Sequence, residues 1–246
     1  MEISLAAETV GHIGSLPVTN SMILSWVASL FLIILTLSAT KKISLIPSKI
    51  QNLFEIIIEF LFDTANTVFD DENVTKKYFP LIATLFIFII TNNWLGLIPG
   101  VGTIGIHTIN SQGQSFLMPV LRSGNADLNM TIALAVVTMI AVQVFGIAAI
   151  GTIKYAKKFI NFKSPIEFFV GMLELVGEFA RIVSFSFRLF GNIFAGEVLL
   201  VVIGFLVAYI APLPFMFLEL FVGFIQALVF TMLTLVFIKG AITEAH

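Results

Sequence analysis

The longest apolar stretch of the chain constrains its fold more than any other feature. Residues 166–208 form a run of 43 residues without proline, and most of their side chains are apolar. As one helix this run would be about 65 Å long at ~1.5 Å per residue, whereas the hydrocarbon core of a bilayer is about 30 Å thick. The helix must therefore break, at Gly191 or Gly196, or lie strongly tilted in a membrane. Because residues 213–239 form a second overlong apolar run, we expect two long tilted helices that form a hairpin, with the turn at residues 210–214 outside the membrane.

Three further apolar runs are long enough to cross a bilayer, which takes about 20 helical residues. They cover residues 22–40, 79–98 and 129–153. Only 11% of the residues are charged, against about 25% in soluble globular domains. We therefore expect an all-α, polytopic membrane protein, a single integral membrane domain over residues 1–246 with five membrane-crossing helices. The loop over residues 99–127 is rich in Gly, Ser, Pro and Asn, which predicts irregular structure there.

Residues 50–69 show a different pattern, in which polar side chains recur every three or four positions among Leu, Ile and Phe. The polar positions are Asn52, Glu55, Glu59, Asp63 and Asn66. This spacing predicts an amphipathic helix, which we place flat at the inner membrane interface. It either packs against a partner subunit or is a loop helix without one.

The lysines orient the predicted helices. If each apolar run crosses the membrane once, every lysine falls on one side, whereas Arg122 is alone on the other side. Loops on the cytoplasmic side carry an excess of Lys and Arg. The N-terminus is therefore expected outside and the C-terminus in the cytoplasm or its equivalent. The lysines are Lys41, Lys42, Lys49, Lys76, Lys77, Lys154, Lys157, Lys158, Lys163 and Lys239.

Polar residues form a stripe along the 166–208 run, at steps of three or four. They are Glu174, Glu178, Arg181, Ser184, Arg188 and Asn192, followed by Ala195. An ionisable side chain at membrane depth costs at least about 2.5 kcal/mol, so such groups normally face a cavity or a partner. The stripe therefore predicts a water path or a protein interface. The alternative is that its members pair with each other, as Glu178 and Arg181 could at a spacing of three.

Arg188 does not fit that alternative. Its helical neighbours three and four positions away are Ser184, Phe185, Gly191 and Asn192, and none of them is acidic. We therefore expect a neighbouring chain to supply its carboxylate. Because arginine keeps its proton even when buried, Arg188 is a fixed positive charge and cannot itself relay protons.

A longer motif surrounds this arginine. It reads Arg188-Leu189-Phe190-Gly191-Asn192 and continues as Ile193-Phe194-Ala195-Gly196-Glu197. Gln226 in the last apolar run, Asp127-Leu128-Asn129 at the start of another, and the segment from Asn92 to Pro99 add independent matches. Together they resemble the a subunit family of rotary F-type ATP synthases, over roughly residues 20–240.

The resemblance implies a role for several residues of this chain. Arg188 would face the carboxylates of a rotor and separate two aqueous half-channels, with Asn192 and Gln226 close to it. Glu197 and Glu219 would line the outer half-channel, and Glu174 and Ser184 the inner one. Asp127 either caps the next helix or helps to wet the outer entrance. These residues are Arg188, Asn192, Gln226, Glu197, Glu219, Glu174, Ser184 and Asp127.

The resemblance also implies partners and a location. A stator subunit of this family works with the ring of c subunits, the b subunits of the peripheral stalk, other ATP synthase subunits, membrane lipid and protons. It holds no cofactor or metal and is not itself an enzyme, because ATP chemistry takes place on other subunits. A bacterial inner membrane is the expected location, with an organelle's inner membrane as the alternative. The family uses protons or, less commonly, sodium as the coupling ion.

Two residue pairs test the predicted hairpin without family knowledge. In an antiparallel pair, the summed numbers of facing residues are nearly constant. The sum for Glu197 and Glu219 nearly equals that for Arg188 and Gln226, so one register brings both pairs together. If the two glutamates lie close, repulsion between them favours protonation of one, which suits a proton path.

Other classes of function fit the sequence less well. Proton-coupled secondary transporters usually show repeated halves and paired broken helices, and neither is visible in the sequence. The chain has no Cys, its His residues lie outside the apolar runs, and it contains no G-x-x-x-x-G-K-[ST] loop. No basic cluster suggests nucleic acid as a partner.

Overall fold

A computed structural model describes residues 7–41, 49–98, 100–101, 104–109, 115–159, 164–207 and 210–243. Within these ranges five helices are long and apolar enough to cross a membrane. They are α1 (Asn20–Thr40), α3 (Glu72–Gly96), α4 (Leu128–Ile150), α6 (Pro165–Leu206) and α7 (Pro212–Ile242). The predicted all-α polytopic fold is thus confirmed. Ala208, Lys42 and Lys163, which entered the predictions above, lie outside the described residues.

The helix α6 is continuous over 42 residues, so neither Gly191 nor Gly196 breaks it. Ser164 caps its first turn by accepting a hydrogen bond from the backbone N–H of Ile166, and Pro165 follows at a position where a missing N–H costs nothing. At ~1.5 Å per residue α6 is about 63 Å long, twice the thickness of a hydrocarbon core. Its partner α7 adds 31 residues. Of the two alternatives, a broken helix or two long helices, the structure shows the second.

Two boundaries differ clearly from the predicted ones. The predicted span 129–153 ends at Ile150, because Gly151 has φ +91°, a conformation that side chains with a Cβ avoid. A short amphipathic helix, α5 (Thr152–Phe159), then leads to α6. The predicted span 79–98 begins earlier, as α3 starts at Glu72 behind the capping side chain of Asp71. The amphipathic helix at 50–69 is present as α2 (Lys49–Phe69).

The loop expected to be irregular contains a hairpin, so that prediction was wrong. Strand β3 (Gly105–Ile109) pairs antiparallel with β4 (Ser115–Pro119). A second hairpin at the N-terminus, β1 (Thr9–Ile13) with β2 (Leu16–Thr19), was not predicted either. A 3-10 turn, η1 (Gly124–Ala126), joins β4 to α4.

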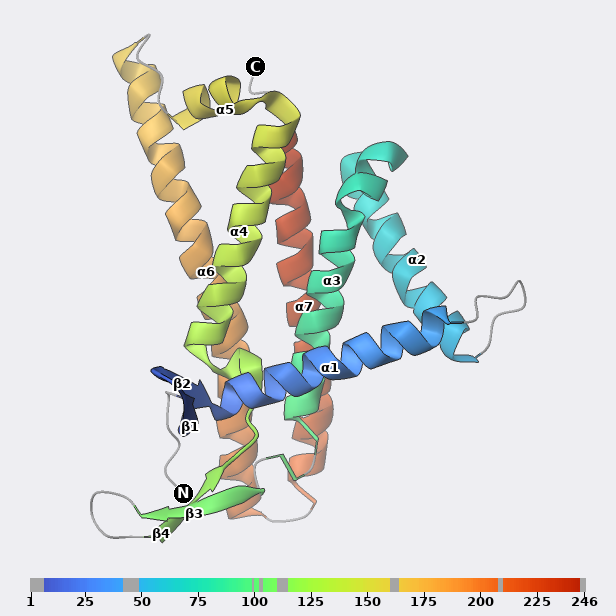
Figure 1. Cartoon of the computed structure of the whole chain (residues 1–246), viewed down its shortest axis with the longest axis vertical. Coiled ribbons are helices and arrows are strands. Elements are labelled where there is room, and N and C mark those ends of the chain that lie inside the picture. Colours follow the sequence, from blue (N-terminus) through green and yellow to red (C-terminus); the bar gives the residue numbers. More distant parts are fainter. Residues whose placement is uncertain are drawn as a thin grey trace.

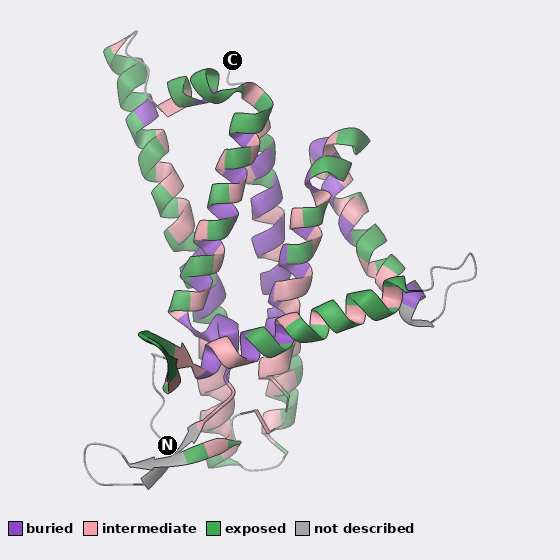
Figure 2. Ribbon diagram, viewed as in Figure 1, coloured by how far each residue is buried: buried purple, intermediate pink, exposed green. Residues whose placement is uncertain are grey.

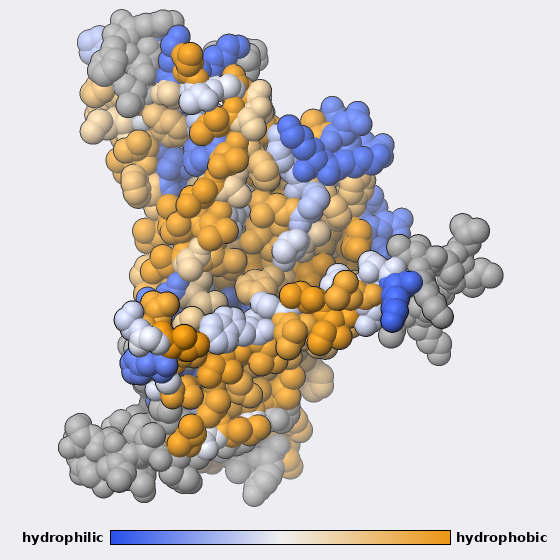
Figure 3. All heavy atoms as spheres, viewed as in Figure 1, coloured by the Kyte–Doolittle hydropathy of each residue, from blue (hydrophilic) through white to orange (hydrophobic). Residues whose placement is uncertain are grey.

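The helices α3, α4, α6 and α7 run alongside one another, whereas α1 lies across them (Figure 1). Both hairpins and the α6–α7 turn lie at one end of the molecule, and α5, the α2–α3 turn and the end of α7 lie at the other. The helix α7 packs against α2, α3, α4 and α6. It carries much of the buried surface, while the far half of α1 is exposed (Figure 2). Apolar side chains cover most of the visible face between the two ends (Figure 3).

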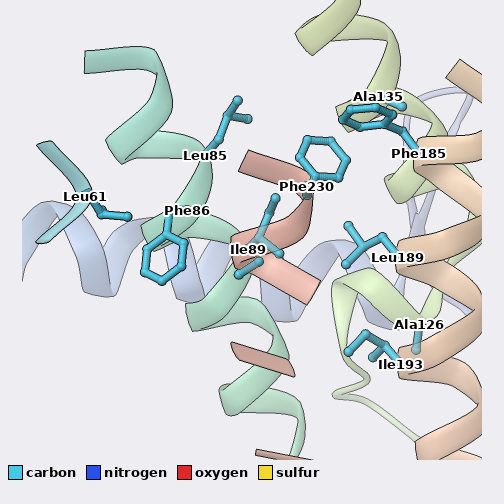
Figure 4. Packing of buried hydrophobic residues seen from close by; sticks show 11 residues of the cluster. Leu61, Leu85, Phe86, Ile89, Ala126, Ala135, Phe185, Leu189, Ile193 and Phe230 are labelled. Carbon is cyan, nitrogen blue, oxygen red and sulfur yellow. The ribbon is translucent and has the colours of Figure 1, made fainter. Parts of the chain in front are cut away.

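The core lies where α3, α4, α6 and α7 meet. Leu189 and Ile89 are fully buried there, and the rings of Phe185 and Phe230 make an edge contact with centroids 4.6 Å apart (Figure 4). In lipid such contacts stabilise through van der Waals packing, because lipid tails are as apolar as the side chains. Small residues such as Ala135 let the helix backbones approach closely. This packing fixes α6 relative to α7 and so positions the site.

The orientation of the molecule can be tested by labelling. The lysine-bearing end and the hairpin end should face opposite sides of the membrane. A cysteine replacing Ile104, which is exposed beside β3, should react with an impermeant thiol reagent from outside only. A cysteine replacing Lys157, exposed on α5, should react from inside only. Labelling of both positions from the same side would contradict the five-span arrangement.

Candidate functional site

Arg188 lies on an exposed face of α6. Ser184, Phe187, Gly191, Asn192 and Ala195 share that face and are exposed as well. The Arg188 Nη2 donates a hydrogen bond to the Ser184 Oγ at 3.1 Å. No carboxylate in the described part of the chain forms an ion pair with the Arg188 guanidinium. The sequence predicted no acidic neighbour for Arg188 on its own helix, and the other described elements supply none either.

The opposite side of the same turn is held by α7. The Gln226 Nε2 donates to the backbone carbonyl oxygen of Arg188 at 3.2 Å, and Gln226 is buried. The register inferred from the sequence therefore holds. However, Gln226 contacts the backbone of Arg188, while the guanidinium points to the exposed face. Gln226 fixes the helix that carries the charge and leaves the charge itself free to face a partner.

Glu197 and Glu219 line one cavity, of about 200 Å³, near the hairpin end of the bundle. Arg122 and Asn93 also line it, together with apolar side chains such as Leu200. The Arg122 Nε donates to the Glu197 Oε2 at 3.2 Å. The two glutamates that the sequence paired are thus brought to one place, and a third, cationic residue accompanies them.

Amide side chains hold the α3 side of this cavity. The Asn93 Nδ2 donates to the carbonyl oxygen of Gly223 at 2.9 Å, and the Asn125 Nδ2 donates to the Asn93 Oδ1 at 2.7 Å. All of these groups are buried. Since a buried polar group is costly unless it is hydrogen-bonded, this network makes the wall of the cavity rigid.

Asp127 has a different place from the other predicted residues. It is 3% exposed, caps α4 by accepting from the backbone N–H of Asn129 at 3.0 Å, and accepts from the Ser21 Oγ at 2.7 Å. It does not line the cavity of Glu197 and Glu219. Of the two interpretations, the structure shows the helix cap, strengthened by a link to α1.

The charged residues nearer the start of α6 form two ion pairs, one with α5 and one within α6. Glu174 makes an ion pair with Lys158 of α5 at 2.8 Å. Glu178 pairs with Arg181, as the spacing predicted, and accepts from the Gln143 Nε2 at 2.9 Å. Glu174 and Ser184 are not neighbours, because ten residues of helix place them about 15 Å apart.

Tyr155 on α5 completes this network, which the sequence did not reveal. Its hydroxyl donates to the Gln143 Oε1 at 2.5 Å. Burial, helped by the nearby carboxylates of Glu178 and Glu174, raises the pKa of the Tyr155 hydroxyl to about 12. Tyr155 is thus a neutral hydrogen-bond donor at physiological pH. Its ring fits against Gly146, where a Cβ would overlap it.

The candidate site combines one fixed cation with carboxyl groups. Within the described ranges no three His, Cys, Asp or Glu side chains gather to hold a metal ion. The arrangement instead offers a fixed cation on an exposed face and two carboxyls in a cavity toward one end. Arg122 and Tyr155 are the functional candidates that sequence reasoning missed. One feature of the sequence could have pointed to Arg122, because it is the cationic residue that the sequence places alone on the side opposite the lysines.

Comparisons with known proteins identify the family of this chain. The family described as ATP synthase A chain matches residues 22–239. The "ATP synthase subunit a" of Syntrophobacter fumaroxidans is 37% identical over 226 residues, which cover 90% of this chain and 84% of the relative. Proteins of the same description from Moorella thermoacetica and Campylobacter jejuni are 33% and 35% identical, and cover 93% and 89% of this chain and 93% and 88% of their own lengths. The chain belongs to the ATP synthase A chain family.

Proposed function

We infer that this chain is the proton-conducting stator subunit of a rotary ATP synthase, and that Arg188 separates its two half-channels. One observation carries the inference. Arg188 presents a permanent positive charge on an exposed face of α6, where no described residue supplies a carboxylate. A bare guanidinium at membrane depth is costly, so a carboxylate from a partner is expected to meet it. A ring of c subunits bearing carboxyls would supply one after another as it turns.

The charge of Arg188 forces each rotor carboxyl to exchange its proton. A protonated rotor carboxyl is neutral and can pass through lipid, whereas Arg188 favours the ionised form of any carboxyl beside it. Each carboxyl would therefore release its proton as it reaches Arg188 and take up another one after leaving it. Net transport then requires one aqueous access on each side. The cavity of Glu197 and Glu219 supplies the outer access in this scheme.

The inner access is proposed to run along α6 from Glu174 to Ser184. Ser184 is exposed next to Arg188, and Glu174 is half-buried beside α5 at the lysine-rich end. Asn192, exposed one turn beyond Arg188, would help to solvate the place where a rotor carboxyl meets Arg188. The hydrogen-bonded cap at Asp127 would keep α4 in place without carrying protons. Sequence similarity and position support these roles.

The proposal places the chain in a larger assembly. It would be non-catalytic, with ATP made or hydrolysed by other subunits, and it would lie in a bacterial inner membrane. The exposed faces of α1 and α2 are available to the b subunits of the peripheral stalk. A secondary transporter is less consistent with the continuous α6 and α7, because transporters of that class usually bind their substrate at broken helices.

Replacing Glu219 by Gln tests the outer access. In inverted vesicles that contain the whole complex, this change should slow ATP-driven proton pumping by about 100-fold, the low end of what a positioned proton-transfer group contributes. The exposed Glu72, paired only with Lys76 on the surface, provides the control, and Glu72→Gln should pump normally. An unchanged pumping rate in Glu219→Gln would remove Glu219 from the proton path.

A further inference from the structure

Arg122 reaches the cavity from outside the long helices. It lies between β4 and η1 in sequence, and its side chain is only 7% exposed. Besides its hydrogen bond to Glu197, its guanidinium carbon lies 5.7 Å from the centroid of the Phe194 ring. The Arg122 side chain therefore contacts two residues of α6, three positions apart on one face. It connects the outer loop to the helix that carries Arg188.

The first residue of α1 supports the segment that carries Arg122. The Asn20 Nδ2 donates to the carbonyl oxygen of Pro119 at 3.1 Å, and the Asn20 backbone N–H donates to the carbonyl oxygen of Glu8 at 3.0 Å. On the other side, the Ser123 Oγ donates to the carbonyl oxygen of Asn92 at 3.3 Å. These bonds hold the backbone on both sides of Arg122.

The two carboxyls of the cavity have different surroundings. Glu197 is fixed by Arg122. The carboxyl of Glu219 has no hydrogen-bond or ion-pair partner among the described residues, and it lies directly against Gly196, where any Cβ would overlap it. Glu219 is 6% exposed, and that exposure faces the cavity it lines. One carboxyl is held in place, and the other is free to exchange a proton.

We propose that Arg122 is a positioning residue of the outer cavity, which holds Glu197 at the loop side and leaves Glu219 as the carboxyl that exchanges protons. This inference rests on the proposed function and assigns different roles to the two glutamates. Arg122 offsets the negative charge of Glu197, so the cavity does not contain two uncompensated carboxylates. Removing the cation would release Glu197 into the space in front of Glu219.

Two of the charged groups near Arg122 come from different parts of the chain. Glu197 faces it from α6, and Glu8 acts on it from the segment before β1. Burial raises the pKa of the Glu8 carboxyl, and the positive charge of Arg122 acts in the opposite direction. Glu8 thus favours its neutral form more than an exposed glutamate does, and Glu197 forms a direct ion pair with the cation.

The position of the Glu197 carboxylate can be tested without removing its charge. Glu197→Asp withdraws the carboxylate from Arg122 by one methylene, and Glu219→Asp makes the same change on the residue without a fixed partner. In vesicles with the whole complex, Glu197→Asp should slow ATP-driven pumping by about 10- to 100-fold, because breaking the contact with Arg122 disturbs the cavity around Glu219, and a small misplacement away from the chemistry can cost that much. Glu219→Asp should lose clearly less, because no bond to a partner is broken.

Arg122 is tested by two further variants, with the amount of this subunit in the purified complex as the assembly control. Arg122→Gln should slow pumping by about as much as Glu197→Asp, whereas Arg122→Lys, which keeps the charge, should restore most of the rate. Normal pumping in Glu197→Asp, or in an assembled Arg122→Gln complex, would overturn the positioning role. The proposed function would survive that result as long as Glu219→Gln still slows pumping, so the two failures are distinguishable.

Discussion

Replacing Arg188 by Ala should abolish ATP synthesis in an otherwise assembled complex. Without the guanidinium nothing favours ionisation of a rotor carboxyl as it passes from one half-channel to the other. Passive proton leak through the membrane sector should persist or rise, because the charge that keeps the two half-channels apart is missing. Both effects are measurable in inverted vesicles, as the rate of respiration-driven ATP synthesis and as the proton leak after the F1 sector has been stripped.

The neighbouring arginine provides a matched control. Arg181 lies on the same helix but is paired with Glu178 and stacks over Phe237, with its guanidinium carbon 4.5 Å from the ring centroid. Arg181→Lys should therefore leave most ATP synthesis intact. Arg188→Lys should lose most of it, since an ammonium lacks the planar fork of arginine and can lose its proton when desolvated. Equal activity of the two lysine variants would show that Arg188 has no special role.

Replacing Gly196 by Ala should also have a large effect. The new methyl group would overlap the carboxyl of Glu219, so the carboxyl must leave its place or α6 and α7 must separate. Overpacking of this kind typically costs about 1–3 kcal/mol of stability. We expect proton pumping to fall by at least about tenfold, which is part of the roughly 10²- to 10⁴-fold that a positioned proton-transfer group contributes. The assay is quenching of a pH-sensitive dye in inverted vesicles during ATP hydrolysis.

Two variants show whether the carboxyl is the cause. Gly177 also lies on α6, and a Cβ there would meet nothing within 4 Å, so Gly177→Ala should pump normally. Adding Glu219→Asp to Gly196→Ala shortens the displaced side chain and should recover part of the lost rate. If Gly196→Ala pumps as well as Gly177→Ala, the close approach of Glu219 to α6 is not needed for transport.

The long helices could be predicted from the sequence because lipid allows few alternatives. Every backbone polar group in a bilayer must be hydrogen-bonded within the segment, so an overlong apolar run such as that of α6 has to be a helix. The register of α6 against α7 followed from two polar pairs, and the hydrogen bond from Gln226 to Arg188 confirms it. The hairpin β3–β4 was missed because its strands are five residues each and carry no strong alternation.

The candidate site was predicted where it follows helix periodicity and missed where it depends on tertiary contacts. Arg188 could be found because charges are rare in apolar runs, whereas Glu197 and Glu219 were assigned through the family resemblance. The ion pair of Arg122 with Glu197 joins residues 75 positions apart, and no local pattern connects them. Tyr155 was missed for a similar reason. The chain turns at Gly151, and only this turn brings Tyr155 of α5 near Glu178 of α6.

The exposed face around Arg188 can be examined directly by photo-crosslinking. Phe187 is adjacent to Arg188 in sequence and is 52% exposed, so benzoylphenylalanine placed there changes the surface little. Phe31 on α1, which is 49% exposed, serves as the control at another lipid-accessible position. Irradiation of the intact complex in membranes should join the probe at position 187 to the small carboxyl-bearing subunit of the rotor ring, and the probe at position 31 should give no such product. Absence of the ring product from position 187 in an assembled, ATP-hydrolysing complex would contradict the claim that Arg188 meets rotor carboxylates.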